Sequence, residues 1–528
     1  MKGTPTRAHS GRGPLGIIAV LSALLLLLFT GCSPVTPAES AHARQATSGP
    51  SGAMTFQLPT EPTAFDPFAA RGTGDFLLAA AHFQPLVAAV EGRVLPRMAV
   101  AWDSTGAEVR VQLKHDRWSD EERMSSGDLI FTIEQHLRPG SESPLLPVLL
   151  RISGAEEYHA GRAQFVDGLV ADSARTVAIT LTEPDPNYVA GLTGLLVLPA
   201  HIYRGRDLGD PQIFREPPVG SGAYLFSAWS GDGTVDLAPN PRVKPLTRLS
   251  GVTGRYVPPT EVVAALERGE LDFASAVPVR DLDRIPDTHR VITAPGDSLI
   301  GLSGRGPLAD VRVRQAVAYA VDRQGLLDRY LDGRGRVSDS PLFIPDWATA
   351  PDRATYPYDP DRARALLAEA NWDPDTEIRL LALTADSDSA VWDRVVEQLG
   401  AVGIRARITI RPIGDGPAAW ADPIVDGVID TVLMPVPDPT LLEPWVSCGT
   451  ASGYCDPHLD DLLARARART APTDRQTAYQ EIDRLLSENL PVIPLWVPDA
   501  AVVVVDGRGG VNALLQPSTA MIDFWGPL

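Results

Sequence analysis

Alternating apolar and polar positions predict strands and helices in turn along most of the chain. Residues 109–114, VRVQLK, alternate with the period of a half-buried strand. Residues 377–383, EIRLLAL, and 404–410, IRARITI, also read as strands, and the segment between them, SDSAVWDRVVEQLGAVG, has a helical period. A strand, a helix and a second strand of these lengths predict a right-handed βαβ unit and therefore a parallel sheet.

Three further segments carry helix signals. Asp128 precedes the amphipathic run LIFTIEQHL and is placed as its cap. Asp359 and Pro360 are placed as N-cap and first helical residue of ARALLAEA. Residues 310–331 have the spacing of one helical face. That face contains Val313, Ala316, Val317, Ala320 and Val321.

The last section combines a helix, TDRQTAYQEIDRLLSENL, with an apolar strand, PVIPLWVP, and then AVVVV. The chain has 528 residues, 44% of them hydrophobic, which is enough for two or three domains. Alternating α and β segments of this length predict two α/β lobes with a cleft between them, where ligands of open sheets bind.

The first 32 residues have the features of an export signal. Arg7 and Arg12 precede the apolar run LGIIAVLSALLLLLFT, which is shorter than a comfortable membrane span and is followed by Gly31 and Cys32. The segment LFTGC resembles a bacterial lipobox, although Phe29 stands where leucine is commonest. We therefore expect residues 1–31 to be a signal peptide and Cys32 to be lipidated; the alternative is a plain signal peptide with an incidental cysteine.

Residues 32–53 then read as a lipidated start and a flexible tether, because they are rich in Ser, Pro, Ala and Gly and lack an apolar period. Two cysteines remain, Cys448 and Cys455 in SCGTASGYC. An even remainder outside the cytoplasm predicts a disulfide. Half of a metal site is the alternative, but the nine histidines are scattered singly, so we expect no metal.

Composition and motifs exclude other classes of protein. A net charge of −19 without a block of basic residues excludes a nucleic-acid surface. GSGAY at 220–224 is not a GxSxG elbow, and neither HExxH nor a phosphate-binding P-loop occurs. We expect no enzyme, no catalytic residue and no cofactor.

Several segments, in order, resemble the family 5 extracellular solute-binding proteins of ABC importers, the group of dipeptide, oligopeptide and nickel receptors. The resemblance begins at residue 54 and extends over about 470 residues. The segments are EPTAFDP, PLVAAVEGRVLPRMAVAWDS, VQLKHDRWSDEERMSSGDLIFTIE, VGSGAYLF, VRVRQAVAYAVDR, YPYDPDRARALLAEANW and RQTAYQEIDRLLSENLPVIPLW.

The resemblance implies a two-lobed, type II periplasmic-binding-protein-like α/β fold with mixed sheets in each lobe and a ligand cleft between them. The first lobe would comprise residues 54–300, including an extra subdomain at about 85–195, and the C-terminal return 489–528. The second lobe would be 301–488, and the crossings would lie near 296–304 and 487–493. Closure around a ligand would be a hinge motion.

The same resemblance bears on the ligand. VLMPVPDP lies where peptide-binding members have a "WxADYxDP" strand, whose aspartate holds the α-ammonium group of the ligand. Aligned on Asp438-Pro439, the tryptophan position is Val432 and the aspartate position is Pro435. Proline carries no charge, so a free amino terminus at that point is disfavoured. Leu433, Met434 and Pro435 remain expected ligand contacts.

Other ligand contacts are expected by the same comparison. Arg71, Gly72 and Thr73 stand where a family loop touches the ligand backbone, and Arg71 could pair with a carboxylate or phosphate. A salt bridge between the lobes is an equally good interpretation of Arg71. Three tryptophans fall near cleft-lining positions and suit peptide side chains or sugar rings, unless they are core residues. They are Trp420, Trp445 and Trp496.

The function expected from these features is that of a lipid-anchored receptor on the outer face of the cytoplasmic membrane. It would capture a peptide or peptide-like ligand for an ABC permease with its ATPase, as a monomer. The alternative is a family-like lipoprotein that binds a non-peptide envelope glycolipid or regulates cell-envelope biosynthesis without transport.

Overall fold

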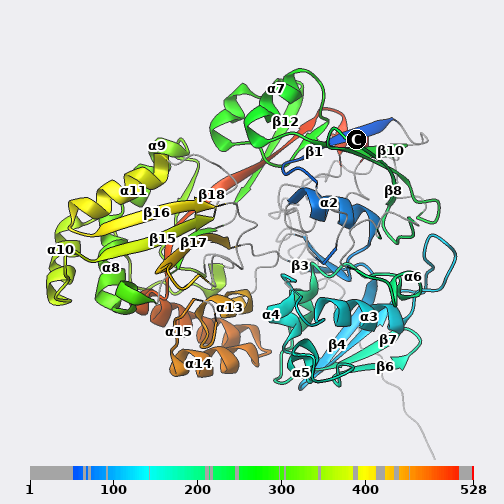
Figure 1. Ribbon diagram of the computed structural model, residues 1–528, viewed down its shortest axis with the longest axis horizontal. Coiled ribbons are helices and arrows are strands. Elements are labelled where there is room, and N and C mark those ends of the chain that lie inside the picture. Colours follow the sequence, from blue (N-terminus) through cyan, green and yellow to red (C-terminus); the bar gives the residue numbers. More distant parts are fainter. Residues whose placement is uncertain are drawn as a thin grey trace, which may run out of the picture. The chain divides into compact units, whose positions relative to one another are not determined.

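Figure 1 shows the computed structural model, whose described part begins at Gly52. The described residues are 52–62, 67–68, 73–90, 93–141, 143–208, 213, 218–243, 249–295, 298–302, 305–342, 346–383, 390–411, 422–432, 439–450, 452–509 and 526–527. Statements about structure below refer to these residues.

The largest sheet is a mixed sheet of 12 strands (Figure 1). Ten of them follow one another in hydrogen-bonded order, and β12 and β14 also pair with β18. The order is β16 (Arg405–Arg411), β15 (Glu377–Leu383), β17 (Gly427–Val432), β13 (Ser298–Leu302), β18 (Val492–Val505), β11 (Phe273–Ala274), β1 (Ala53–Leu58), β10 (Gly251–Tyr256), β9 (Thr234–Pro239) and β8 (Tyr224–Ser230), with β12 (His289–Pro295) and β14 (Gly335–Val337) off this path.

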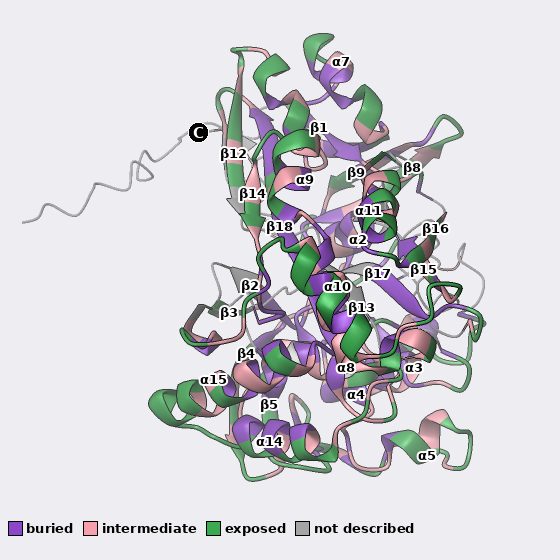
Figure 2. Cartoon of the chain, turned by 90° about the vertical axis from the view of Figure 1, so that its left-hand side faces the viewer, coloured by how far each residue is buried: buried purple, intermediate pink, exposed green. Residues whose placement is uncertain are grey.

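Strand β18 joins the two halves of this sheet. Its first half pairs with β13 and β14 and its second half with β11 and β12, and Figure 2 shows it buried along most of its length. The predicted strand PVIPLWVP and the segment AVVVV after it lie in this one strand, because β18 continues through Pro494 and Pro498. The register to β13 shifts between Leu299 and Ile300, opposite Trp496 and Pro494, and such an irregularity accommodates a residue without an N–H.

A separate four-stranded antiparallel sheet lies earlier in the chain. Its order is β4 (Ala99–Thr105), β5 (Glu108–Leu113), β7 (Thr176–Thr180) and β6 (Leu169–Ser173). Two hairpin-sized sheets complete the β-structure: β2 (Val87–Val90) with β3 (Arg93–Pro96), and β19 (Arg508–Gly509) with β20 (Gly526–Pro527).

Helices cover these sheets and form a cluster of their own near the C-terminus. The α-helices are α2 (Thr73–His82), α3 (Ser126–His136), α4 (Leu146–Leu149), α5 (Ala155–His159), α6 (Ala200–Tyr203), α7 (Val262–Glu267), α8 (Val311–Ala320), α9 (Arg323–Tyr330), α10 (Pro360–Glu369), α11 (Ala390–Ala401), α13 (Glu443–Val446), α14 (Pro457–Arg467) and α15 (Pro472–Asn489). Short 3-10 helices are η1 (Tyr188–Leu192), η3 (Pro259–Glu261), η4 (Val279–Arg284), η5 (Gly306–Ala309), η6 (Asp346–Ala348) and η8 (Pro439–Leu442). Among the helices described, none is both long and apolar enough to cross a membrane.

The predicted βαβ unit is confirmed: β15 and β16 are parallel neighbours, and α11 connects them. The cap of α10 is also confirmed, since the Asp359 side chain accepts hydrogen bonds from the backbone N–H groups of Asp361 and Arg362. Asp128, by contrast, is not the N-cap of α3. Ser125 holds that position, and the Asp128 carboxylate accepts from the Ser125 backbone N–H at 2.8 Å, as the third-residue partner of a capping box.

The single face predicted for residues 310–331 is divided between two helices. Helix α8 ends at Ala320, Val321 is extended, and α9 begins at Arg323. Asp322 causes the interruption, because its carboxylate accepts the backbone N–H of Gly325 at 2.9 Å and so caps a new helix. The apolar residues predicted there still pack in one core with α10, α11 and Trp496.

Two histidines, His82 and His136, are buried, and their burial predicts that the stability of the fold decreases in acid. The Nδ1 atom of His82 accepts the Phe226 backbone N–H at 3.1 Å, which leaves the proton on Nε2, 3.3 Å from the Val219 carbonyl. Burial lowers the pKa of His82 to about 4 and that of His136 to about 3.

We therefore expect the free energy of unfolding to fall as the pH is lowered from 7 to 5. The unfolded chain takes up protons on both histidines below about pH 6.5, whereas the folded chain does not, so the loss is on the order of 2 kcal/mol per histidine. Urea titrations at the two pH values measure it. In His136→Phe, which keeps a ring beside Phe68, the histidine part of the loss should be halved; an unchanged pH dependence would contradict the assignment.

Candidate functional site

The sheet register brings two of the predicted functional segments together. Val432, the last residue of β17, pairs with Ser298, the first residue of β13. The next residue of β13, Leu299, pairs with Trp496 of β18. Strand β17, which precedes the expected ligand contacts, therefore ends beside the start of β13, and the next residue of β13 pairs with a predicted tryptophan.

The tryptophans that the structure describes differ in their surroundings. Trp496 is 5% exposed and stacks on Trp392 of α11, with ring centroids 6.4 Å apart. Trp445 lies in α13, partly buried against the apolar cluster of α14 and α15. Stacking inside a core accounts for Trp496 without a ligand, and a ligand contact by either residue stays a prediction.

The other predicted contacts lie at or beyond the limits of the described residues. Thr73 is the first residue of α2, and its side chain is not described. Arg71, Gly72, Trp420, Leu433, Met434, Pro435 and the lipobox residue Cys32 lie outside the described residues.

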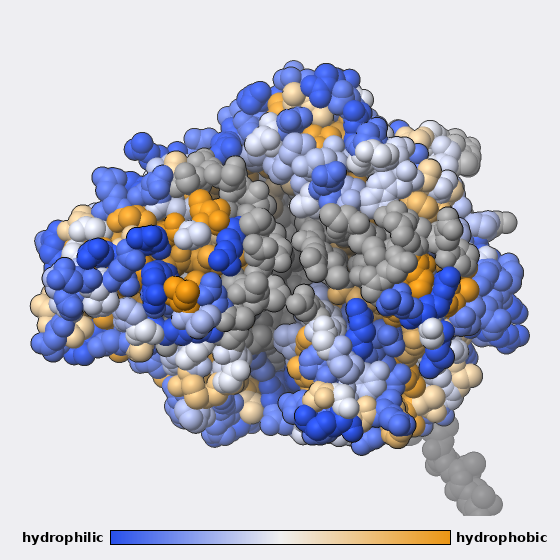
Figure 3. All heavy atoms as spheres, viewed as in Figure 1, coloured by the Kyte–Doolittle hydropathy of each residue, from blue (hydrophilic) through white to orange (hydrophobic). Residues whose placement is uncertain are grey.

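Both faces of the sheet beside the expected ligand strand are apolar. Ile378 and Ala382 of β15 belong to the core formed with α8, α10 and α11, whereas Leu381 and Leu383 form a second buried cluster with residues of the 425–428 segment. Figure 3 shows polar side chains over most of the visible face, with an apolar area over β15 to β17. Strands buried on both faces are typical of parallel sheets in α/β proteins.

A buried arginine that sequence reasoning missed holds the end of α15, just before β18. Arg314 of α8 is 4% exposed, and its guanidinium donates to three backbone carbonyls. Two donors reach the Asn489 carbonyl at 2.6 and 3.0 Å, and the third group reaches Leu308 and Ala309 at 2.9 Å. The guanidinium also lies 5.9 Å from the ring centre of Tyr454.

Arg323, at the start of α9, has a similar role to that of Arg314. It is 5% exposed, and it donates to the carbonyls of Ser338, Tyr356 and Pro494 at 2.5, 2.5 and 3.1 Å. Asp339 pairs with the same guanidinium at 2.8 Å. The segment VRVRQAVAYAVDR contains three arginines together with Gln315 and Asp322, so its pattern does not single out Arg314 and Arg323 as buried.

Cys448 and Cys455 are bonded to each other in the structure. The loop that they close contains Tyr454, the aromatic neighbour of Arg314. Among the residues that the structure describes, no group of three or more His, Cys, Asp or Glu side chains is arranged to hold a metal ion.

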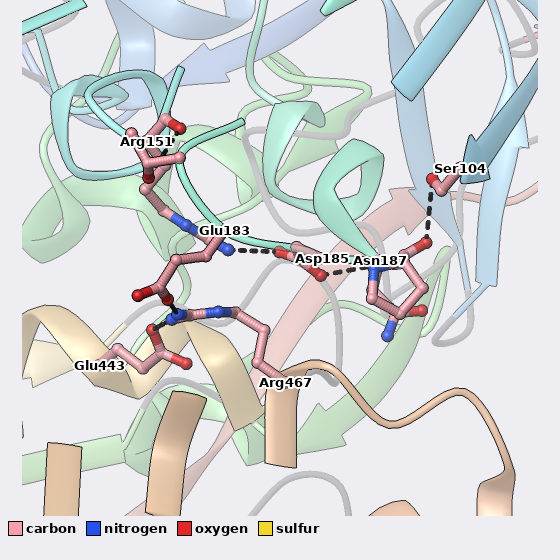
Figure 4. A network of polar contacts seen from close by, with 9 residues as sticks. Ser104, Arg151, Glu183, Asp185, Asn187, Glu443 and Arg467 are labelled. Carbon is pink, nitrogen blue, oxygen red and sulfur yellow. Dashed lines mark hydrogen bonds and ion pairs between the residues drawn. The ribbon is translucent and has the colours of Figure 1, made fainter. Parts of the chain in front are cut away.

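A charged network lies where α13 and α14 meet the segment after β7 (Figure 4). Arg467 of α14 pairs with Glu443 of α13 and with Glu183. Nearby, Arg151 pairs with the buried Asp185 at 2.8 Å. Burial raises the pKa of the Glu443 carboxyl, and the Arg467 charge acts against that rise.

Two solved structures define the class of fold. The agropinic acid complex of AgaA from A. tumefaciens R10 has a TM-score of 0.79 at 20% identity, covering 90% of this chain and 99% of the other. The oligopeptide-binding protein AppA from Bacillus subtilis, in complex with a nonapeptide, has a TM-score of 0.75 at 19% identity, covering 91% and 99%. The chain therefore has the two-lobed α/β fold of periplasmic binding proteins, as the sequence predicts.

The family follows from the sequence. The family described as bacterial extracellular solute-binding proteins, family 5 (middle region), matches residues 93–452, and this chain belongs to it. A putative ABC transporter peptide-binding protein of Brucella ovis is 25% identical over 462 residues, covering 82% of this chain and 84% of the relative.

Proposed function

We propose that this protein is a lipid-anchored receptor of an ABC importer, which captures a peptide or peptide-like solute between its lobes and delivers it to a permease and its ATPase. Family membership over residues 93–452 carries this proposal. The relative from Brucella ovis is named as a peptide-binding protein of an ABC transporter, and AppA was solved with a nonapeptide.

The lobe boundaries expected from the sequence belong to the proposal. Lobe I would comprise residues 54–300 and 489–528, and lobe II residues 301–488. Arg314 and Arg323 support it physically, because they hold the backbone around Asn489 and Pro494, where the chain would return to lobe I. The receptor would work as a monomer that closes by a hinge.

The proposed contacts are Arg71, Gly72, Thr73, Trp420, Leu433, Met434, Pro435, Trp445 and Trp496. Pro435 argues for a ligand whose positive amino end is blocked or lies elsewhere, because a buried ammonium without a partner is costly.

The same proline favours a second candidate function. In it, the cleft binds a non-peptide envelope glycolipid, or the protein regulates envelope biosynthesis without transport. The AgaA complex supports a non-peptide ligand, because that protein of the same fold was solved with agropinic acid.

The direct test identifies what the cleft retains. The chain from residue 32, with Cys32→Ser for purification without lipid, is purified without denaturation and analysed by native mass spectrometry. Recovered peptides would support the peptide receptor. Recovery of a glycolipid would favour the second candidate. So would a ligand-stripped sample whose melting temperature is not raised by any peptide of a library.

Lipid anchoring predicts a separate result. Cells that process bacterial lipoproteins and are fed an alkyne fatty acid should label the wild-type chain, and Cys32→Ser should abolish the label because the acceptor thiol is gone. Ser33→Ala, one residue further on, is the matched control and should keep the label. Label that persists in Cys32→Ser would refute the anchor.

A further inference from the structure

The Arg467 network connects two regions of the chain with separate cores. One apolar cluster is built on the four-stranded sheet and its helices, between residues 86 and 219. Another is built on η6, α13, α14 and α15, between residues 342 and 492. The two clusters share no residue among those described. The pair between Arg467 and Glu183 joins groups 284 positions apart in sequence, one from each region.

The three charged groups of the network are unequally exposed. The side chains of Arg467 and Glu443 are 10% and 13% exposed, whereas that of Glu183 is 57% exposed. Arg467 and Glu443 belong to the same region, so the ion pair between them would remain if the two regions separated. Glu183 would then complete its hydration, which costs little because most of its side chain already faces water.

The surroundings of Glu183 keep it in reach of Arg467. Asp185, two residues on, is 1% exposed; it accepts from Arg151 and, at 2.9 Å, from the Asn187 backbone N–H. Arg151 also lies 5.8 Å from the ring centre of Tyr188 (Figure 4 shows the charged groups). The segment that carries Glu183 is therefore held in place by its own region of the chain, independently of Arg467.

We propose that the ion pair between Arg467 and Glu183 is a latch that stabilises the closed form of this binding protein, with Glu443 keeping Arg467 in position in the open form. The inference rests on the proposed function, because it assumes that the regions joined by the latch separate when the receptor opens.

The test compares two glutamates of equal exposure. Glu157 of α5 is also 57% exposed, but its partner Arg162 lies in the same region of the chain. Residues 48–527 form a compact unit of their own, so the chain from residue 32 with Cys32→Ser is suitable. Spin labels at Glu156→Cys and Asp474→Cys, both exposed positions in the two regions, report the separation by pulsed dipolar spectroscopy.

Without any ligand, Glu183→Gln should lower the ratio of short to long separations about fivefold, as expected for the loss of one partly exposed ion pair. Glu157→Gln should leave the ratio unchanged, and 1 M salt should reproduce the effect of Glu183→Gln in the parent chain. Equal distance distributions in Glu183→Gln and the parent would overturn the latch. Because no ligand is present, the latch can be supported even if the retained solute contradicts the proposed peptide receptor.

Discussion

Gly222→Ala is expected to lower the free energy of unfolding by about 3 kcal/mol or more, or to prevent folding. A Cβ atom at residue 222 would lie 2.1 Å from the carbonyl oxygen of Ala81, at the end of α2. The contact is with backbone, which cannot rotate away, and Gly222 is further held by its N–H bond to the His82 carbonyl at 2.8 Å.

Urea titration of the parent protein and of Gly222→Ala measures this change. Gly231→Ala is the matched control: it lies in the turn between β8 and β9, and a Cβ atom there has nothing within 4 Å. We expect this control to change stability by less than about 0.5 kcal/mol. If both variants unfold at the same urea concentration, the close approach of Gly222 to α2 is not a constraint on the fold. The glycines of VGSGAYLF would then need another explanation.

Arg323→Met is expected to lower the free energy of unfolding by about 3–5 kcal/mol. Methionine keeps most of the side-chain volume but leaves three buried carbonyls, those of Ser338, Tyr356 and Pro494, without their donor. Arg323→Lys should recover only a fraction of the loss, because one ammonium cannot reproduce the planar fork of donors.

Arg329→Met in the same helix provides the control, because Arg329 is exposed and stacks on Tyr330. It should stay within about 0.5 kcal/mol of the parent. Equal stabilities of Arg323→Met and Arg329→Met, measured by denaturant or by melting temperature, would show that the buried guanidinium does not hold β18.

The sequence predicted best those elements that depend on interactions between residues close together in the chain. The βαβ unit around α11 and the cap at Asp359 depend on residues a few positions apart, so periodicity and capping rules were sufficient. The same rules misplaced the cap of α3 at Asp128, although Ser125 lies only three residues earlier. Both residue types can cap a helix, and only the backbone conformation shows that Ser125 is the N-cap and that Asp128 accepts its N–H. The rules also missed the end of α8 at Ala320, since the apolar face continues through Val321 while Asp322 starts a new helix.

The candidate site also has features that the order of residues indicated and features that only the fold shows. The resemblance indicated the ligand strand, the aligned position of Pro435 and the tryptophans, all of which are properties of residue order. It did not indicate that Trp496 is 5% exposed against Trp392, because the partner lies 104 positions away and is brought there by the sheet.

By itself, the sequence predicted the family and the α/β class, and both are confirmed, because they depend on local patterns and on ordered motifs. The export and lipidation signals stay predictions. Only the tertiary structure decided which charges are buried and what they hold. Arg314, Arg323 and Arg467 look like ordinary surface arginines along the chain. Their roles arise where the fold brings carbonyls or carboxylates from distant segments to a guanidinium that water no longer reaches.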